Sequence, residues 1–268
     1  MVEVQVDKKF TDILRVICIC NDIPMLKNQR MVSSAILDDD DRRATLLMNL
    51  KRRDGVLSIT SPWAEVETWI PLVDLQKESK SRDDGKYYEF YCSLIFLLSD
   101  LCQNRNYLTI KTVRSYFPLD ICIDIIVSKE YKFMLRSAFS KLILTLWIDV
   151  SPFIQQKIPS NLKIWEEIGT TNQLKITSTN HDWVNQYKKL VEFIFEFLKN
   201  EEIETKFDEK GEFFIQLVKL VQMMLSIGFF QECKMFKDLF DHLYEIIKKT
   251  DKVFWKKIGA SEEEVKTG

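Results

Sequence analysis

The sequence predicts an all-α fold, an armadillo- or HEAT-like helical stack with one irregular loop region. Only 7 glycines and 6 prolines occur in 268 residues, so few residues interrupt helices. Apolar residues recur at helical spacing through most of the chain. Residues 87–149 contain two long and two short helical patterns with short links, which is typical of such stacks. No clear internal repeat is present, so the stack is inferred from packing alone.

The composition argues against several classes of protein. The net charge is −2, whereas non-specific nucleic-acid binding needs many cations on one face, so no nucleic-acid partner is expected. The longest uninterrupted apolar run is residues 94–98, far short of the roughly 20 residues of a membrane span. The N-terminus lacks an apolar signal-peptide core. We therefore expect a soluble chain with no direct membrane insertion.

Two helices are expected at the N-terminus, over residues 7–20 and 24–37. Asp7 or Thr11 suits the N-cap of the first helix, and Pro24 suits the first position of the second. The residues expected on the inward face of the first helix are Phe10, Ile13, Leu14, Ile17 and Cys18.

Four consecutive carboxylates, residues 38–41, precede a helix expected over residues 40–50, with Leu46, Leu47 and Leu50 inward. Anions favour the positive end of a helix dipole, which makes a helix start the preferred interpretation. A calcium-binding EF-hand loop would need a glycine at its sixth position and a glutamate at its twelfth. This segment contains no glycine, and Asn49 occupies its twelfth position.

Residues 51–86 form the expected irregular region and the boundary between N-terminal helices (residues 1–50) and a solenoid-like domain (residues 87–258). A basic cluster, residues 51–53, precedes an Asp54-Gly55 turn. The short β-branched segment of residues 56–60 that follows allows a strand-like, extended piece. Three cations are too few to indicate a phosphate site. The charged residues 76–86 predict an exposed loop.

The solenoid-like domain contains most of the expected helices. The first, residues 87–102, is apolar nearly all round and therefore buried. Residues 169–180 are polar and predict a loop, and residues 259–268 predict a flexible tail. The other expected helices are residues 107–116, 120–128, 130–148, a brief helix through Trp165, 180–200, 211–227 and 231–249.

Six cysteines are predicted to be buried free thiols, because each lies in an apolar pattern and no secretion signal precedes them. They are Cys18, Cys20, Cys92, Cys102, Cys122 and Cys233.

No active site is recognisable in the sequence. The only histidines, His181 and His242, lie far apart, and no nucleophile-elbow, phosphate-loop, dinucleotide or zinc-protease motif occurs. No catalytic, cofactor-binding or metal-binding residue is therefore predicted, no cofactor is expected, and the chain is not expected to be an enzyme.

Two stretches resemble the inositol-trisphosphate receptors. Residues 100–110 (DLCQNRNYLTI) are similar to a helix-turn-helix segment of that family, and residues 135–149 (LRSAFSKLILTLWID) to a second segment. Residues 165–168 and 227–230 match two further landmarks in the same order. The landmark residues of the first segment are Arg105, Tyr107, Leu108 and Ile110.

Residues 17–29 (ICICNDIPMLKNQ) also resemble the ryanodine receptors, in Cys18, Cys20, Asn28 and Gln29. Ryanodine receptors continue from that helix pair into a β-rich SPRY domain. This chain continues into helices instead, as inositol-trisphosphate receptors do, and the latter family is therefore favoured.

The resemblance implies a part of a tetrameric calcium-release channel of the endoplasmic reticulum membrane. This chain would be a cytosolic armadillo-like region downstream of the ligand-binding core, relaying or scaffolding between that core and the pore. Its partners would be other domains or subunits of the channel. No β-trefoil pattern, basic ligand-binding cluster or pore helix is evident, so the chain alone is expected neither to bind inositol trisphosphate nor to conduct ions.

Two other functions remain open. An unrelated armadillo-like scaffold would bind peptides in a groove lined by an Asn or Trp ladder, which the tryptophans do not obviously form. An enzyme would need a carboxylate-lined pocket with shifted pKa values. The tryptophans are Trp63, Trp69, Trp147, Trp165, Trp183 and Trp255.

Overall fold

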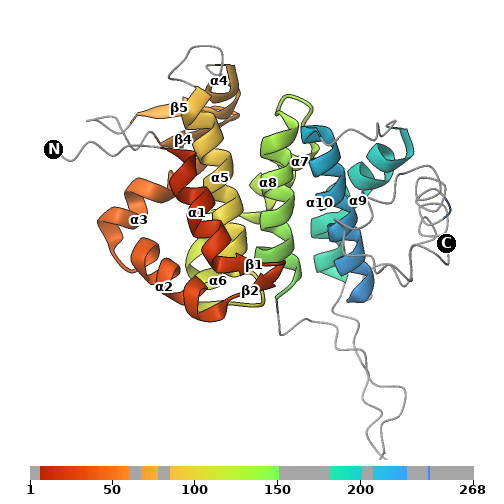
Figure 1. The fold of residues 1–268 in the computed structure, drawn as a ribbon. Coiled ribbons are helices and arrows are strands. Elements are labelled where there is room, and N and C mark those ends of the chain that lie inside the picture. Colours follow the sequence, from red (N-terminus) through yellow and green to blue (C-terminus); the bar gives the residue numbers. More distant parts are fainter. Residues whose placement is uncertain are drawn as a thin grey trace, which may run out of the picture.

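Four helices lie side by side in a row, in the order in which they occur along the chain (Figure 1). The structure, a computed structural model, describes residues 7–60, 68–77, 85–150, 181–200, 208–227 and 241. Each helix of the row packs extensively against the next. The row consists of α1 (Lys8–Cys18), α5 (Gly85–Cys102), α8 (Phe133–Ile143) and α10 (Glu209–Ser226).

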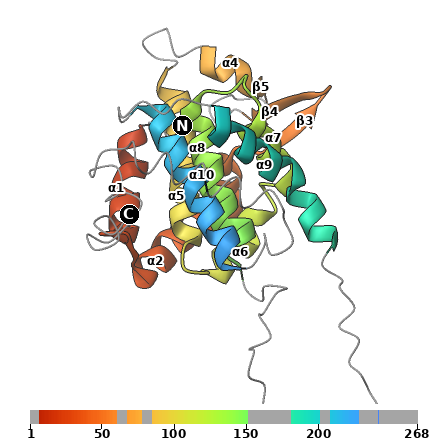
Figure 2. The same cartoon turned by 90° about the vertical axis from the view of Figure 1, so that its right-hand side faces the viewer.

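Further helices cover this row. Helix α7 (Leu119–Val127) packs on α8, and α9 (His181–Asn200) packs on α7 (Figure 2). Helices α2 (Leu26–Leu37) and α6 (Tyr107–Arg114) pack on α5, and α3 (Asp40–Leu47) packs on α2. The described residues are thus mostly helical, which confirms the all-α expectation in broad terms.

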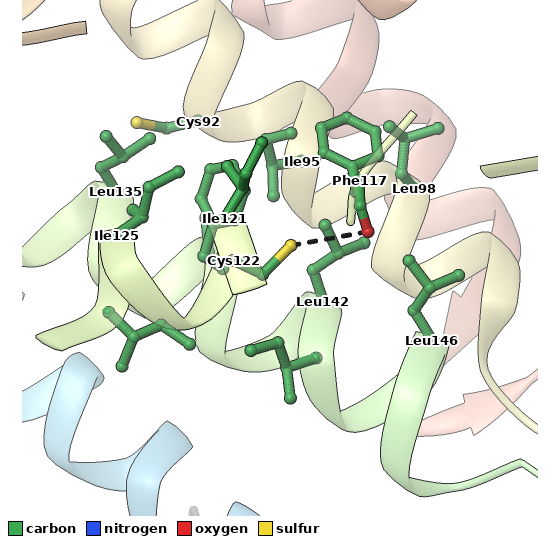
Figure 3. Packing of buried hydrophobic residues seen from close by; sticks show 14 of the residues in the cluster. Cys92, Ile95, Leu98, Phe117, Ile121, Cys122, Ile125, Leu135, Leu142 and Leu146 are labelled. Atoms are coloured by element: carbon green, nitrogen blue, oxygen red, sulfur yellow. Dashed lines mark hydrogen bonds between the residues drawn. The ribbon is translucent and has the colours of Figure 1, made fainter. Parts of the chain in front are cut away.

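The core is centred on α5 and α8. Residues 135–140 of α8 are all buried, as expected for a helix that is packed on several sides. Figure 3 shows Ile95 of α5, Cys122 of α7 and Leu142 of α8 meeting in this core. The ring of Phe139 packs edge-on against Phe117, with 6.1 Å between centroids. The predicted burial of residues 87–102 is confirmed by the cluster around α5.

Helix ends largely follow the signals in the sequence. Asp7 caps α1 by accepting a hydrogen bond from the backbone N–H of Lys9 at 2.9 Å. Pro118 separates α6 from α7, as the residue before proline is disfavoured in helices. Asp40 and Asp41 lie in the first turn of α3, where their charges favour the helix start. The helix expected over residues 130–148 is instead α8 followed by a π-helical turn, η2 (Leu144–Ile148).

The prediction that residues 51–86 are irregular is wrong for the part of this region that the structure describes. That part holds an antiparallel sheet, ordered β3 (Leu50–Arg53), β4 (Val56–Thr60) and β5 (Trp69–Pro71), and then α4 (Leu72–Lys77). Both turn residues between β3 and β4 have positive φ, 49° at Asp54 and 82° at Gly55, as a two-residue hairpin requires. Strand β3 is hard to recognise in the sequence, because all its residues after Leu50 are charged and only Leu50 has a buried side chain.

The expected burial of the first helix is confirmed for Cys18 and wrong for much of the predicted face. Phe10, Ile13 and Ile17 are exposed, Leu14 is half-buried, and Thr11 is buried without having been predicted inward. Hydrogen bonds decide its orientation, since the Thr11 hydroxyl donates to the Ser93 hydroxyl at 2.7 Å.

A hairpin follows α1 in place of a direct helix–helix link. Strand β1 (Ile19–Cys20) pairs with β2 (Ile23–Pro24), so Pro24 ends a strand and does not begin a helix. The turn residues Asn21 and Asp22 have positive φ, 49° and 62°. These side chains tolerate that conformation better than most, which the helical pattern does not reveal.

Several predictions lie outside the described residues. They are the brief helix through Trp165, the loop over residues 169–180, the helix over residues 231–249 and the tail over residues 259–268. The division into domains stays a prediction as well.

Substituting a buried and an exposed leucine tests whether core packing determines the stability of the fold. Leu142 of α8 is 0% exposed, whereas Leu108 of α6 is 78% exposed. Leu142→Ala should lower the free energy of unfolding by about 2–5 kcal/mol, because it removes buried apolar atoms and leaves a cavity. Leu108→Ala should change it by no more than about 0.5 kcal/mol. Urea unfolding followed by circular dichroism measures both, and equal effects would contradict the described core.

Candidate functional site

The described residues contain a buried polar junction where α1, α5 and α8 meet, centred on Asp100. The Asp100 side chain is only 3% exposed. Its Oδ2 accepts a hydrogen bond from Nε of Arg15 in α1 at 2.9 Å, and its Oδ1 pairs with Nζ of Lys141 in α8. One carboxylate therefore joins the first three helices of the row.

Gln29 holds α2 against the Asp100 junction. Its Nε2 donates to the backbone oxygen of Asp100 at 2.7 Å and to that of Gln103 at 3.2 Å. Asp100 lies in the last turn of α5 and Gln103 directly follows the helix, where carbonyls lack the i→i+4 partners of a helix interior. The Asp100 oxygen also accepts from the Gln103 N–H at 3.3 Å. The buried amide thus caps α5 while it holds α2 against it. Asn28 acts in a similar way on α1, because its Nδ2 donates to the Ile17 oxygen at 2.8 Å.

The electrostatics of the junction suit a structural role. A carboxylate with two cationic partners is compensated, and removing it would leave two partly buried cations without their counter-charge. Burial, followed by the negative charge of Asp100, raises the pKa of the Cys18 thiol to about 11. Cys18 is therefore protonated and a poor nucleophile at neutral pH.

A second polar junction joins the α5–α6 turn to the end of η2. Asn104 and Arg105 both have positive φ, 57° and 59°, and Nε of Arg105 pairs with Oδ1 of Asp149 at 2.9 Å. In α6, Arg114 donates through Nη2 to the Leu146 oxygen at 2.6 Å and lies over the Trp147 ring at 4.5 Å.

A third junction lies on the other side of α8. Arg136 is 4% exposed, and its Nε donates to the Ile126 oxygen of α7 at 2.8 Å. Its guanidinium lies against phenylalanines of three helices, at 4.5 to 5.2 Å from the ring centroids, where cation–π attraction is favourable. They are Phe133 of α8, Phe193 of α9 and Phe213 of α10.

These junctions contain many of the residues that carry the family resemblance. Gln29, Asp100 and Lys141 meet in the first junction, and Arg105 and Asp149 in the second. Tyr107 and Leu108 are exposed and Ile110 is buried. The segment of residues 165–168 and most of residues 227–230 lie outside the described residues. The sequence analysis identified the segments but missed the contacts, because their partners lie 41 to 85 positions apart.

The described thiols are mostly buried, as predicted, whereas Cys233 lies outside the described residues. Cys18, Cys92, Cys102 and Cys122 are free and buried, and burial raises the pKa of Cys92 to about 12. The thiol of Cys122 donates to the Phe117 oxygen at 3.7 Å (Figure 3). Cys20 is exposed, so its predicted burial is wrong, because it lies in β1 and not on the buried face of α1.

No catalytic or metal-binding arrangement emerges from the side chains that the structure describes. Among them, no group of three or more His, Cys, Asp or Glu residues could hold a metal ion. The side chains of His181 and His242 are not among those described. Within the same residues, no helix combines the length and apolarity needed to cross a membrane.

Several known proteins match the chain distantly, among them two inositol-trisphosphate-receptor relatives. Over 149 residues the chain is 26% identical to an inositol 1,4,5-trisphosphate receptor of Caenorhabditis elegans, covering 52% of this chain and 5% of that protein. Over 187 residues it is 24% identical to an inositol 1,4,5-trisphosphate receptor-like protein of Dictyostelium discoideum, covering 65% of this chain and 6% of that protein. No protein-family model matches the chain. These distant relatives agree with the resemblance found in the sequence, and the chain spans only about one twentieth of their length.

The first junction can be tested with two matched substitutions. Asp100→Asn should lower the free energy of unfolding by about 3 kcal/mol, since it leaves Arg15 and Lys141 without their shared anion. Asp149→Asn disrupts a pair whose arginine is 46% exposed, and it should cost at most about 1 kcal/mol. Urea unfolding in low salt measures both. The junction would lose its proposed importance if the two variants were equally stable.

Two cysteines that are two positions apart test the orientation of α1. With a pKa of about 11, only about one Cys18 thiol in a thousand is ionised at pH 8. The folded chain should therefore react with iodoacetamide at Cys20 while Cys18 stays unmodified, as read by peptide mass spectrometry. The raised pKa of Cys18 also makes the free energy of unfolding depend on pH. Below about pH 9 the thiol is protonated in both the folded and the unfolded chain, so stability is retained, and it should fall as the pH rises towards 11. Equal labelling of both thiols at pH 8 would contradict the described packing.

Proposed function

We propose that this chain is a non-catalytic, cytosolic helical segment of an inositol-trisphosphate-gated calcium-release channel, where it relays movement between the ligand-binding core and the pore. One observation carries the proposal. Asp100 and Lys141, which come from the two stretches that resemble inositol-trisphosphate receptors, meet in one buried junction. The two distant inositol-trisphosphate-receptor relatives support the same family.

The proposed relay depends on polar contacts at both sides of α8. Lys141 reaches Asp100 and so couples α8 to α5, while Arg136 contacts α7, α9 and α10. Tilting one helix would leave one of these buried charges without its partners. In this proposal the helices move together, and a displacement at α1 reaches α10 as a rigid-body shift.

The setting of the segment belongs to the same proposal. The helical row would be part of an armadillo-like array at the cytosolic face of the endoplasmic reticulum membrane, in a tetrameric channel. Its partners would be other domains or subunits of that channel.

An unrelated peptide-binding scaffold is the alternative, and the described tryptophans do not favour it. Trp69 of β5 lies under Lys51 and Arg53, at 5.9 and 5.0 Å from its ring centroid. Trp147 of η2 is held by Arg114 and donates to the Phe117 oxygen at 3.2 Å. These two rings belong to different elements and are engaged by their own cations. The side chains of the other four tryptophans are not described.

The proposal predicts the ligand behaviour of the isolated chain. Isothermal titration calorimetry should detect no binding of inositol trisphosphate to the chain, because the basic cluster that such a ligand needs is absent from it. A receptor ligand-binding core serves as the positive control and should also bind the chain in a pull-down. Strong binding of inositol trisphosphate by the chain, or failure to bind the core, would contradict the proposal.

A further inference from the structure

The three-stranded sheet has an open edge strand. Strand β3 stands at the end of the order β3-β4-β5 and pairs with β4 alone. The tip of the β3–β4 hairpin points away from the helices in Figure 2. Three consecutive basic residues of β3, which we call the basic edge, are all exposed, and they are Lys51, Arg52 and Arg53. A strand with one free side can accept a further strand from another molecule.

The main chain of Arg52 faces the free side of β3. Hydrogen-bonded and non-bonded pairs alternate along an antiparallel ladder. Residues that flank a two-residue turn form a bonded pair, so Arg53 bonds to β4, and so does Lys51 two positions earlier. The hydrogen bond from the Thr60 N–H to the Asn49 oxygen, at 3.1 Å, continues this alternation. The N–H and C=O of Arg52 therefore point outward, and within the described residues neither has a hydrogen-bond partner.

The side chains of Lys51 and Arg53 place two positive charges on the outer face of the sheet. Both lie over the Trp69 ring of β5, with Nζ of Lys51 at 5.9 Å and Cζ of Arg53 at 5.0 Å from its centroid. Cation–π attraction holds the two charges in place. By the register of the strands, none of the other strand residues on this face is acidic, and they are Val56, Ser58, Thr60 and Pro71.

Arg52 points to the opposite face and holds the strand on the helices. Its Nη2 pairs with Oδ2 of Asp124 in α7. The other oxygen of this carboxylate, Oδ1, pairs with Nζ of Lys189 in α9. Two cations thus share one anion, so a positive charge remains in excess on this face as well.

Charged residues on an edge strand also prevent unwanted pairing. Side chains that only protect an edge project beside it, whereas Lys51 and Arg53 reach across β4 to Trp69. They therefore lie away from the free side of Arg52 and keep positive charge close to it. Such an edge rejects basic strands and selects an acidic one, because only a partner with carboxylates compensates both cations.

We propose that an extended, acidic segment of a partner protein binds beside the basic edge as an antiparallel fourth strand, with carboxylates at two alternate positions. The residue between these carboxylates exchanges two main-chain hydrogen bonds with Arg52. Its two neighbours then lie opposite Lys51 and Arg53 as non-hydrogen-bonded pairs, in which side chains are closest. Opposite charges at such cross-strand positions stabilise the pairing.

The small number of contacts makes this association weak. Two main-chain hydrogen bonds and two exposed ion pairs each contribute little in water, so a short peptide should bind with a dissociation constant on the order of 1 mM. The site goes beyond the proposed function and does not depend on it, because it follows from the sheet and its charges alone.

NMR titration of the full chain tests the site directly. The probe is an acetylated and amidated Thr-Glu-Val-Glu-Thr peptide, and the control peptide has Gln in place of both Glu residues. With the probe, the amide signals of residues 51–53 and the indole signal of Trp69 should shift, and the Arg52 N–H should exchange more slowly with solvent. The control peptide should bind several-fold more weakly.

Two double variants with equal loss of charge separate this site from general electrostatic attraction. Lys51→Gln with Arg53→Gln should weaken binding of the probe several-fold, because it removes both cations of the outer face. The matched control is Lys27→Gln with Arg30→Gln, at two exposed positions of α2. It should bind the probe like the unchanged chain.

A probe with an N-methylated central Val tests the main-chain bonds, because it cannot donate to the Arg52 oxygen. It should bind several-fold more weakly than the unmodified probe, and equal binding would overturn strand addition. Equal binding of the Gln peptide, or an unchanged Arg52 amide signal, would overturn the site. So would tighter binding of a single-stranded oligothymidylate through Lys51 and Arg53, because the surface would then recognise nucleic acid.

Discussion

The buried polar contacts of α8 constrain the rest of the structure. A helix packed on several sides could slide along or rotate against its neighbours if every contact were apolar, because dispersion forces have little direction. Arg136 and Lys141 prevent this, since each needs particular partners. Arg136 contacts a carbonyl of α7 and phenylalanines of α9 and α10, and Lys141 contacts the buried carboxylate of α5. The register of α8 against four other helices is therefore specified by two side chains.

Local patterns predicted most of the helices, and non-local contacts account for the errors. The pattern of residues 87–149 predicted α5 to α8 well, because most apolar residues there are buried and Pro118 separates α6 from α7. The face of α1 was wrong because Ser93 and Asp100 lie more than 80 positions away. Residues 56–60 suggested the extended segment that is β4, but its pairing into a sheet was missed, because β3 is mostly charged and Leu50 fits a helical pattern equally well. One local feature of the sequence indicates the polar junctions, and it is an Asp or Arg within an otherwise apolar helix.

The residues that resemble the calcium-release channels act, in this structure, mainly on packing. Gln29, Asp100 and Lys141 fix helix positions, and Arg105 with Asp149 holds a turn whose backbone has positive φ. A segment of this kind contributes stiffness and defined surfaces. The exposed apolar face of α1, with Phe10, Ile13 and Val16, is one such surface, because Thr11 on the opposite side of the helix bonds to Ser93.

The central claim is that α1, α5, α8 and α10 form one cooperative body. Native-state hydrogen exchange in low urea tests this most directly, because it gives the opening free energy of each helix separately. The account predicts one shared opening free energy for the buried amides of all four helices. It also predicts that Arg136→Ala lowers the value for α10 first. Exchange of α10 at a lower free energy than α5 in the unchanged chain would contradict the claim, since the helices would then open independently.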